Sequence, residues 1–173
     1  VGGFEKVYEL GRIFRNEGIS TKHNPEFTSV EIYQAFSNYV DMMNLTEELI
    51  KDIVTDICGS LVINYQNNEI DFSKPWTRIS MKDVVKKYTG LDFDSFNGDF
   101  QTAKKAVNNI NVDVSNKVNS IGRLLNEVFE QKVESELIEP TFVIDYPVEI
   151  SPLARPHLDN KEMVQRFELF IVG

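Results

Sequence analysis

The sequence predicts an α+β fold in which helices pack on one face of a mainly antiparallel sheet. Two observations support this prediction. Apolar and polar residues alternate in several short segments, as they do when successive side chains of a strand point to opposite faces. Residues 41–58 and 120–137 instead carry apolar residues at helical spacing. Because no internal repeat or linker divides the 173 residues, we expect one domain over residues 1–173.

The first two strands of the predicted sheet are joined by a polar loop at residues 18–26. Alternation puts one set of side chains on a common face of this antiparallel pair: Arg15, Glu17, Phe27, Glu31 and Tyr33. The opposite face carries an apolar set: Leu10, Phe14, Val30, Ile32 and Phe36. We therefore expect a packed back and a front that binds a ligand, beside a loop too long for a tight turn. The alternative is an ordinary half-buried hairpin whose outer face is charged.

A helix is expected over residues 41–58, and it should cover the apolar back of the sheet. It begins either at a capping box of Asn44 and Glu47 or one turn sooner, at Asp41, and Gly59 ends it. Its apolar residues recur at helical spacing: Leu45, Leu49, Ile53 and Ile57.

Shorter elements follow this helix. Strands at 61–65 and 69–72 flank the turn-forming residues 66–68, which indicates a small hairpin. A short helix is expected over residues 81–88, and Gly90 ends it.

Residues 91–119 are polar and rich in asparagine, so we interpret them as a peripheral, mobile excursion that includes a helix near 99–109. Asp92, Asp94 and Asp99 lack the ligand spacing of an EF-hand, which argues against a calcium site.

The second long helix, at residues 120–137, is followed by two further strands. They cover residues 141–145 and 163–171, and in the last one Arg166 and Glu168 share a charged face opposite an apolar one. We expect this last strand to lie beside the first hairpin.

Composition limits the classes of function. The 18 Lys and Arg against 27 Asp and Glu give a formal net charge of −9, which is the wrong sign for a protein whose main task is nucleic-acid binding. No segment is apolar over the length of a membrane span, and no signal-peptide pattern opens the chain. A single cysteine, Cys58, suits a reducing compartment. His157 is interpreted as a solvated loop histidine rather than a catalytic one. We expect a cytoplasmic protein with no membrane partner.

Residues 14–17 (FRNE) and 23–28 (HNPEFT) resemble motif 2 of the class II aminoacyl-tRNA synthetases, with the motif region at residues 4–36. Its continuation through Glu31 and Tyr33 is similar to the lysyl-tRNA synthetases of that class. Further blocks resemble the same enzymes, at residues 1–9, 140–142, 146–147, 151–154 and 166–170. The resemblance extends over the chain and is weakest at 91–119.

The resemblance implies activation of L-lysine by ATP, with Mg²⁺, and transfer of the lysyl group to tRNA(Lys). It assigns Arg15 the catalytic role of holding the α-phosphate and the substrate carboxylate, which a guanidinium can do at once. It implies that Phe27 stacks on adenine, that Glu17 contacts the adenine edge or a substrate amino group, and that His23 approaches the outer phosphates. Glu168 matches a magnesium carboxylate; the alternative is a salt bridge with Arg166.

By the same resemblance, Glu31 and Tyr33 define the lysine pocket. A carboxylate with a phenol suits an ammonium group and argues against the aspartate and asparagine enzymes of the subclass. Two alternatives remain: a stand-alone paralogue that lysylates an elongation factor, and a non-catalytic scaffold role in a multisynthetase complex.

The chain is expected to be an excerpt of a larger enzyme that acts as a homodimer. Motif 1, an upstream acidic pocket residue, the anticodon-binding domain and motif 3 are absent from it. We therefore predict that residues 1–173 alone have little or no activation activity.

Overall fold

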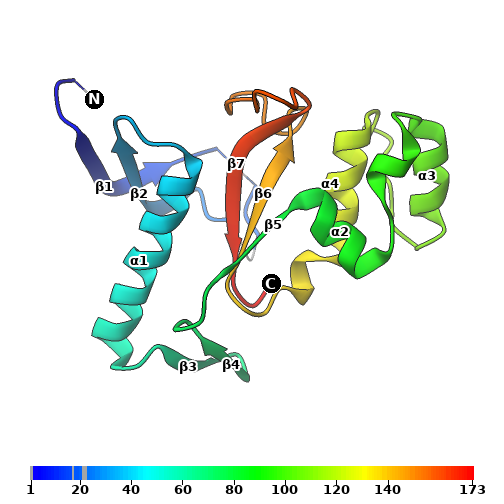
Figure 1. Ribbon diagram of the computed structural model, residues 1–173. Helices are drawn as coiled ribbons and strands as arrows, with labels where there is room; N and C mark the ends of the chain where they lie inside the picture. Colours follow the sequence, from blue (N-terminus) through cyan, green and yellow to red (C-terminus); the bar gives the residue numbers. More distant parts are fainter. Residues whose placement is uncertain (1, 17, 21–22) are drawn as a thin grey trace. The chain divides into compact units, whose positions relative to one another are not determined.

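The computed structural model describes residues 2–16, 18–20 and 23–173. They fall into two compact units, Val1–Asp41 and Met42–Gly173, each described by itself below (Figure 1). The prediction that they form one domain stays a prediction.

The first unit is built on the predicted antiparallel hairpin of β1 (Lys6–Phe14) and β2 (Glu26–Gln34). In its register Glu9 lies opposite Glu31, and Ile13 lies opposite Phe27. Backbone pairing continues past the strand ends, where the Arg15 N–H donates to the Pro25 carbonyl at 2.9 Å.

The apolar face of this hairpin has no second layer within the first unit itself, and the predicted packing of residues 41–58 on that face concerns both units and stays a prediction. Leu10 and Phe14 are 65% and 73% exposed, and Val30 is 48% exposed. Phe36 follows β2 with a positive φ of 58°, so it is not on the strand face at all, and it is fully exposed. An isolated two-stranded hairpin has no second layer to bury such a face.

The long helix α1 (Tyr39–Cys58) begins before either predicted start. The Asn38 side chain accepts the backbone N–H of Asp41 at 3.2 Å, and the Asp41 carboxylate accepts that of Asn38 at 2.8 Å. This reciprocal pair is a capping box. The predicted box of Asn44 and Glu47 is wrong, because both residues lie inside the helix.

The polar side of α1 packs near the start of the next sheet. Arg78 donates to Asn44 at 2.7 Å and to Glu47 at 3.3 Å, and the Lys51 ammonium lies 5.6 Å from the centre of the Trp76 ring. Three side chains of the predicted apolar stripe are exposed: Leu49, Ile53 and Ile57.

The small hairpin is confirmed, with β3 (Val62–Tyr65) antiparallel to β4 (Asn68–Asp71). Gln66 and Asn67 have φ values of 49° and 65°. Positive φ at both central residues is the signature of a type I′ turn, whose twist matches that of the flanking strands.

A three-stranded sheet forms the centre of the second unit (Figure 1), in the order β5 (Thr77–Ser80), β6 (Thr141–Pro147), β7 (Met163–Phe170). The β5–β6 pair is parallel and the β6–β7 pair is antiparallel. Among the described residues three of the four strand pairs are antiparallel, so the predicted α+β, mainly antiparallel fold is confirmed. The expected position of β7 beside the first hairpin concerns both units and stays a prediction.

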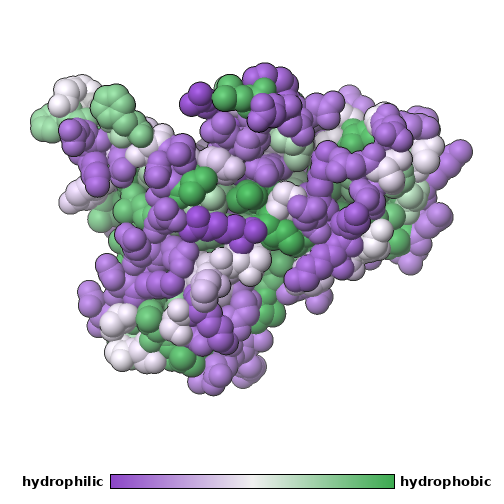
Figure 2. Space-filling model, in the orientation of Figure 1, coloured by the Kyte–Doolittle hydropathy of each residue, from purple (hydrophilic) through white to green (hydrophobic). Residues whose placement is uncertain are grey.

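α2 (Met81–Thr89) and α4 (Ile121–Lys132) pack on the face of this sheet that carries Val143 and Val164, and α3 (Phe100–Asn108) packs on α4. The short helices η1 (Phe93–Phe96) and η2 (Glu134–Glu136) connect these elements. The helices predicted at 81–88 and 99–109 are confirmed. The one predicted at 120–137 ends earlier as an α-helix and continues as η2. Figure 2 shows that the visible outer face of this helical part is mostly hydrophilic, as expected when the apolar sides face the core.

The segment 91–119 is packed more closely than its polar composition predicts. Phe93, Ala103 and Val107 are buried in the core that α2 and α4 share, and so is Val118. That the segment is a peripheral, mobile excursion stays a prediction.

The aspartates of this segment serve local structure. Asp92 pairs with Lys86 at 2.7 Å and Asp94 with Lys82 at 2.5 Å, while Asp99 caps α3. Within residues 2–16, 18–20 and 23–173, no three acidic, histidine or cysteine side chains cluster as a metal site would require. In the same described part of the chain, no helix combines the length and apolar character needed to cross a bilayer.

Candidate active site

The hairpin register places most of the predicted front face together. Residues directly opposite one another in an antiparallel pair share a face, so Ile13 with Phe27 and Glu9 with Glu31 lie on the same side of the sheet. Tyr33 pairs with Val7 on this same side. The prediction that Phe27, Glu31 and Tyr33 share a face is thus confirmed.

Arg15 joins this face at the loop end of the hairpin. Its guanidinium carbon lies 5.6 Å from the centre of the Phe27 ring, within cation–π distance. An aromatic plate and a guanidinium side by side are suited to a ring system that carries an anionic group. Phe27 is half-buried and Arg15 is exposed.

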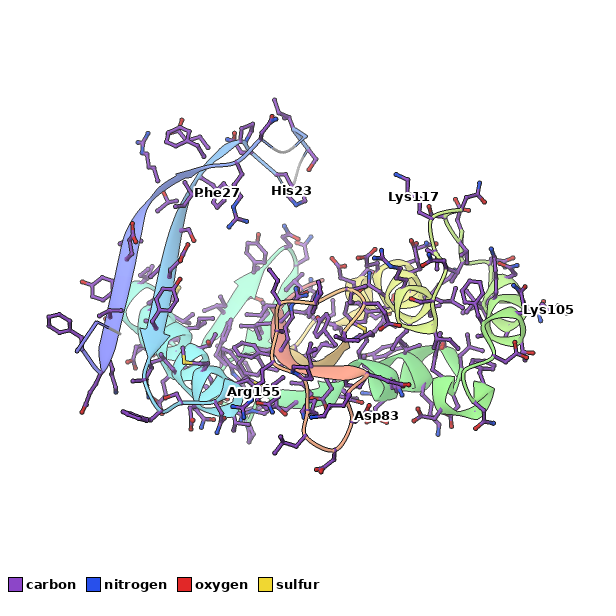
Figure 3. The ribbon with its side chains drawn as sticks, turned by 90° about the horizontal axis from the view of Figure 1, so that it is seen from above. His23, Phe27, Asp83, Lys105, Lys117 and Arg155 are labelled. Atoms are coloured by element: carbon purple, nitrogen blue, oxygen red, sulfur yellow. The ribbon has the colours of Figure 1, made fainter. Side chains whose placement is uncertain are left out.

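His23 lies in the loop, near the same end of the hairpin as Phe27 (Figure 3). Its Nδ1 is 3.0 Å from the Ser20 hydroxyl, and the backbones of Ser20 and His23 exchange two hydrogen bonds. Ser20 and His23 are therefore joined through both backbone and side chains. The predicted nucleotide contact Glu17 lies outside the described residues.

Glu31 and Tyr33 form a direct pair at the far end of this face. The Tyr33 hydroxyl donates to Glu31 Oε2 at 2.7 Å. This hydrogen bond and the negative charge of Glu31 raise the pKa of Tyr33, with a smaller contribution from Glu9. The phenol therefore remains a protonated donor, and the carboxylate stays available to a cation.

Glu9 is a candidate that the sequence reasoning did not single out. It lies directly across the ladder from Glu31, so two carboxylates face each other on one side of the hairpin. Like charges opposite one another destabilise a sheet. A cationic ligand would relieve that repulsion. The pair is visible only in the register between the two strands, which cannot be read from the sequence.

Glu168 lies on β7 in the second unit. The sequence predicted either a magnesium ion or a salt bridge with Arg166 as the partner of its carboxylate. It forms the salt bridge with Arg166 that the sequence offered as an alternative, and it accepts the Tyr146 hydroxyl at 3.1 Å. Arg166 in turn donates to the Ser151 hydroxyl. The carboxylate lines a cavity of about 210 Å³ together with Glu130 and other side chains of α4 and β7.

The donor chemistry at Glu168 fits one ligand of a magnesium ion. Magnesium at nucleotide sites is held by one or two carboxylates together with substrate phosphates. The Glu168 side chain is 40% exposed. A carboxylate offers about four acceptor positions, so lone pairs remain beyond its contacts with Arg166 and Tyr146. The predicted convergence of Glu168 with the hairpin face concerns both units and stays a prediction.

The family described as tRNA synthetases class II (D, K and N) matches the chain over residues 1–173. Relatives named lysine–tRNA ligase in Prochlorococcus marinus align with all of it, at 91% identity in strain MIT 9312, 79% in strain MIT 9515 and 61% in strain MIT 9313. The aligned part is 34% of each relative, so the chain spans about a third of their length. With a family match over its whole length, the chain belongs to the class II tRNA synthetases of the D, K and N group.

Proposed function

We propose that the protein containing this chain is a lysine–tRNA ligase that activates lysine with ATP and transfers it to tRNA(Lys). The single observation that supports this most strongly is the 91% identity, over the whole chain, to a relative of that name. The shared face of Arg15, Phe27, Glu31 and Tyr33 gives the proposal its chemistry. We further propose that the whole protein is a homodimer in the cytoplasm.

In the first step a carboxylate oxygen of lysine attacks the α-phosphorus of ATP and forms lysyl-adenylate. The bond between the α-phosphorus and the oxygen that links it to the β-phosphate breaks, and pyrophosphate leaves. Such a transfer needs charge neutralisation and alignment more than covalent help. Arg15 would hold an α-phosphate oxygen and the lysine carboxylate together, while Phe27 stacks on adenine. His23 would reach the outer phosphates, and Glu17 the adenine edge or a substrate amino group.

Glu168 would hold a magnesium ion, which would supply positive charge to offset that of the phosphates. In this proposal Glu168 acts only by binding and orienting that ion.

Lysine would be selected at Glu31 and Tyr33, with Glu9 adding to the negative potential. We predict that Glu31→Gln lowers kcat/KM for lysine by about 100-fold or more, because the neutral amide cannot pair with the charge of the lysine ammonium. Glu69→Gln, at an exposed position on β4, is the matched control and should change kcat/KM less than about twofold. Equal effects of the two substitutions on lysine-dependent pyrophosphate exchange would contradict the assignment of the pocket.

The decisive experiment uses the full-length protein with ATP, labelled lysine and three acceptor conditions: tRNA, an elongation factor, and no acceptor. The proposal expects lysine-dependent pyrophosphate exchange and label on tRNA(Lys) only. Label on the protein acceptor instead would select the elongation-factor paralogue. Absence of exchange from folded protein would leave only the scaffold role and overturn the proposal.

A further inference from the structure

Strand β6 reverses its side-chain alternation at Asp145. Val143 lies opposite Glu168 and shares its face of the sheet. Regular alternation would put Asp145 on that face and Tyr146 on the other. Asp145 has a φ of 59°, and the register shifts there, so that Tyr146 lies opposite Val164.

The consequence is that Tyr146 is on the side of the sheet that carries Glu168. Residues 164, 166 and 168 alternate onto one face of β7, and pairing with Val164 puts Tyr146 with them. Without the reversal, the Tyr146 ring would point toward the opposite face, where Phe142 and Phe167 pack at 5.4 Å.

Tyr146 makes two contacts in this position. Its hydroxyl donates to Glu168 Oε2 at 3.1 Å, and the Arg166 guanidinium carbon lies 4.7 Å from the centre of its ring. The side chain is 2% exposed. Because Arg166 binds the other oxygen, Oε1, both oxygens of Glu168 are held.

Asp145 is itself held in its left-handed conformation. Its carboxylate Oδ1 lies 2.8 Å from His157 Nε2, which corrects the interpretation of His157 as a solvated loop residue. The loop is fixed along β7, since the His157 N–H donates to the Met163 carbonyl at 3.0 Å. Aspartate is among the few residues that enter this conformation at modest cost.

We propose that Tyr146 is a positioning residue for Glu168 and that the left-handed conformation of Asp145 is what brings it there. This inference rests on the proposed function, because it concerns the carboxylate assigned to the metal. A carboxylate with both oxygens bound by fixed donors keeps one orientation toward its ion. Loss of such an outer partner typically weakens metal affinity 10- to 100-fold.

The experiment measures equilibrium binding of ATP to the full-length protein as a function of Mg²⁺ concentration, together with the melting temperature. Tyr146→Phe removes the hydroxyl and keeps the ring beside Arg166. We expect it to need about 10-fold more Mg²⁺ for half-maximal ATP binding, with an unchanged KM for lysine. Tyr88→Phe, on α2, is the matched control and should leave the Mg²⁺ dependence unchanged.

A second pair of variants separates the backbone conformation from the contact with His157. Asp145→Gly and Asp145→Val both remove that contact, but only glycine accepts the positive φ freely. We expect Asp145→Gly to stay within about twofold of the wild-type Mg²⁺ dependence. Asp145→Val should shift it as Tyr146→Phe does. Equal behaviour of the two Asp145 variants would overturn the role of the left-handed residue.

Glu168→Gln separates the metal-binding role of Glu168 from the positioning role of Tyr146. If Glu168→Gln shifts the Mg²⁺ dependence and Tyr146→Phe does not, the positioning role is wrong while the metal role stands. If Glu168→Gln leaves the Mg²⁺ dependence unchanged in protein that melts normally, the metal role fails and the positioning role fails with it.

Discussion

At the scale of single residues, the side of the hairpin on which a side chain lies decides what it can do. Arg12 and Arg15 are both exposed arginines near the end of β1. Arg15 lies beside the Phe27 ring, whereas Arg12 pairs with Glu26 on the other face at 2.6 Å. The two arginines therefore offer a natural comparison of the two faces.

We predict that Arg15→Ala lowers the rate of lysyl-adenylate formation by 100-fold or more, on the scale of about 3 kcal/mol for one lost oxyanion donor. Arg12→Ala removes an equal charge from the opposite face and should lower that rate by less than about threefold. Pyrophosphate exchange by the full-length protein measures both. Similar losses in the two variants would mean that the charge, rather than its face, matters.

At the scale of elements, the helices of the second unit owe their starts to side-chain caps. Ser80, Asp99 and Ser120 each accept backbone N–H groups in the first turn of α2, α3 and α4. The caps fix where each helix begins, because the first N–H groups have no partner inside a helix.

The cap of α3 predicts a pH dependence. Hydrogen bonds, first from the Thr102 hydroxyl and then from backbone N–H groups, lower the pKa of Asp99. Because the pKa of Asp99 is lower in the folded state than in the unfolded state, the ionised cap stabilises the helix at pH values above the unfolded-state pKa of about 3.9. That stabilisation is lost as the pH falls through the folded-state pKa. Hydrogen-exchange protection of α3 should therefore fall below about pH 4.

Asp99→Asn keeps a capping oxygen but has no carboxylate to titrate. In this variant the hydrogen-exchange protection of α3 should change less with pH than in the wild type over the same range, after correction for intrinsic exchange rates. An unchanged pH profile in this variant would assign the effect to another group.

A second element-scale feature is the close approach of α4 to the end of β6. A Cβ on Gly122 would lie 2.5 Å from Pro147 Cβ and 2.4 Å from the Glu149 carboxylate. The same Glu149 carboxylate accepts the Gly122 N–H at 3.3 Å. Only glycine lets the helix start lie this close to the chain after β6.

We predict that Gly122→Ala destabilises the second unit by about 1–3 kcal/mol, the usual cost of overpacking. Hydrogen exchange of α4 or chemical denaturation measures it. Gly11→Ala is the matched control, since no atom lies within 4 Å of its added Cβ, and it should not destabilise the hairpin. A neutral Gly122→Ala would mean that Pro147 and Glu149 move aside freely.

At the scale of the whole molecule, the chain is about a third of the length of its relatives. As the resemblance implies, we expect motif 1, motif 3 and further pocket residues to lie outside it.

We therefore predict that residues 1–173, expressed alone, show little or no lysine-dependent pyrophosphate exchange, while the full-length protein is active. The matched control is the full-length protein at equal concentration and Mg²⁺. An exchange rate of the isolated chain near that of the intact protein would contradict this prediction.

Much of the candidate site could be predicted from the sequence. The alternation of residues 27–33 correctly placed Phe27, Glu31 and Tyr33 on one face, because an extended backbone has no other way to direct its side chains. Glu9 was missed because its position across from Glu31 depends on the register between two strands. The buried residues within 91–119 were not predicted, because composition measures average polarity, whereas burial depends on the few apolar residues that face the core.

The sequence by itself determined the local features of this protein: helix caps, the type I′ turn and the faces of regular strands, all of which follow from sterics within a few residues. Only the tertiary structure decided where the regular alternation of side chains along a strand is broken. One left-handed residue, Asp145, turns Tyr146 toward Glu168, and no pattern of letters records it, because alternation holds only while every backbone dihedral stays extended.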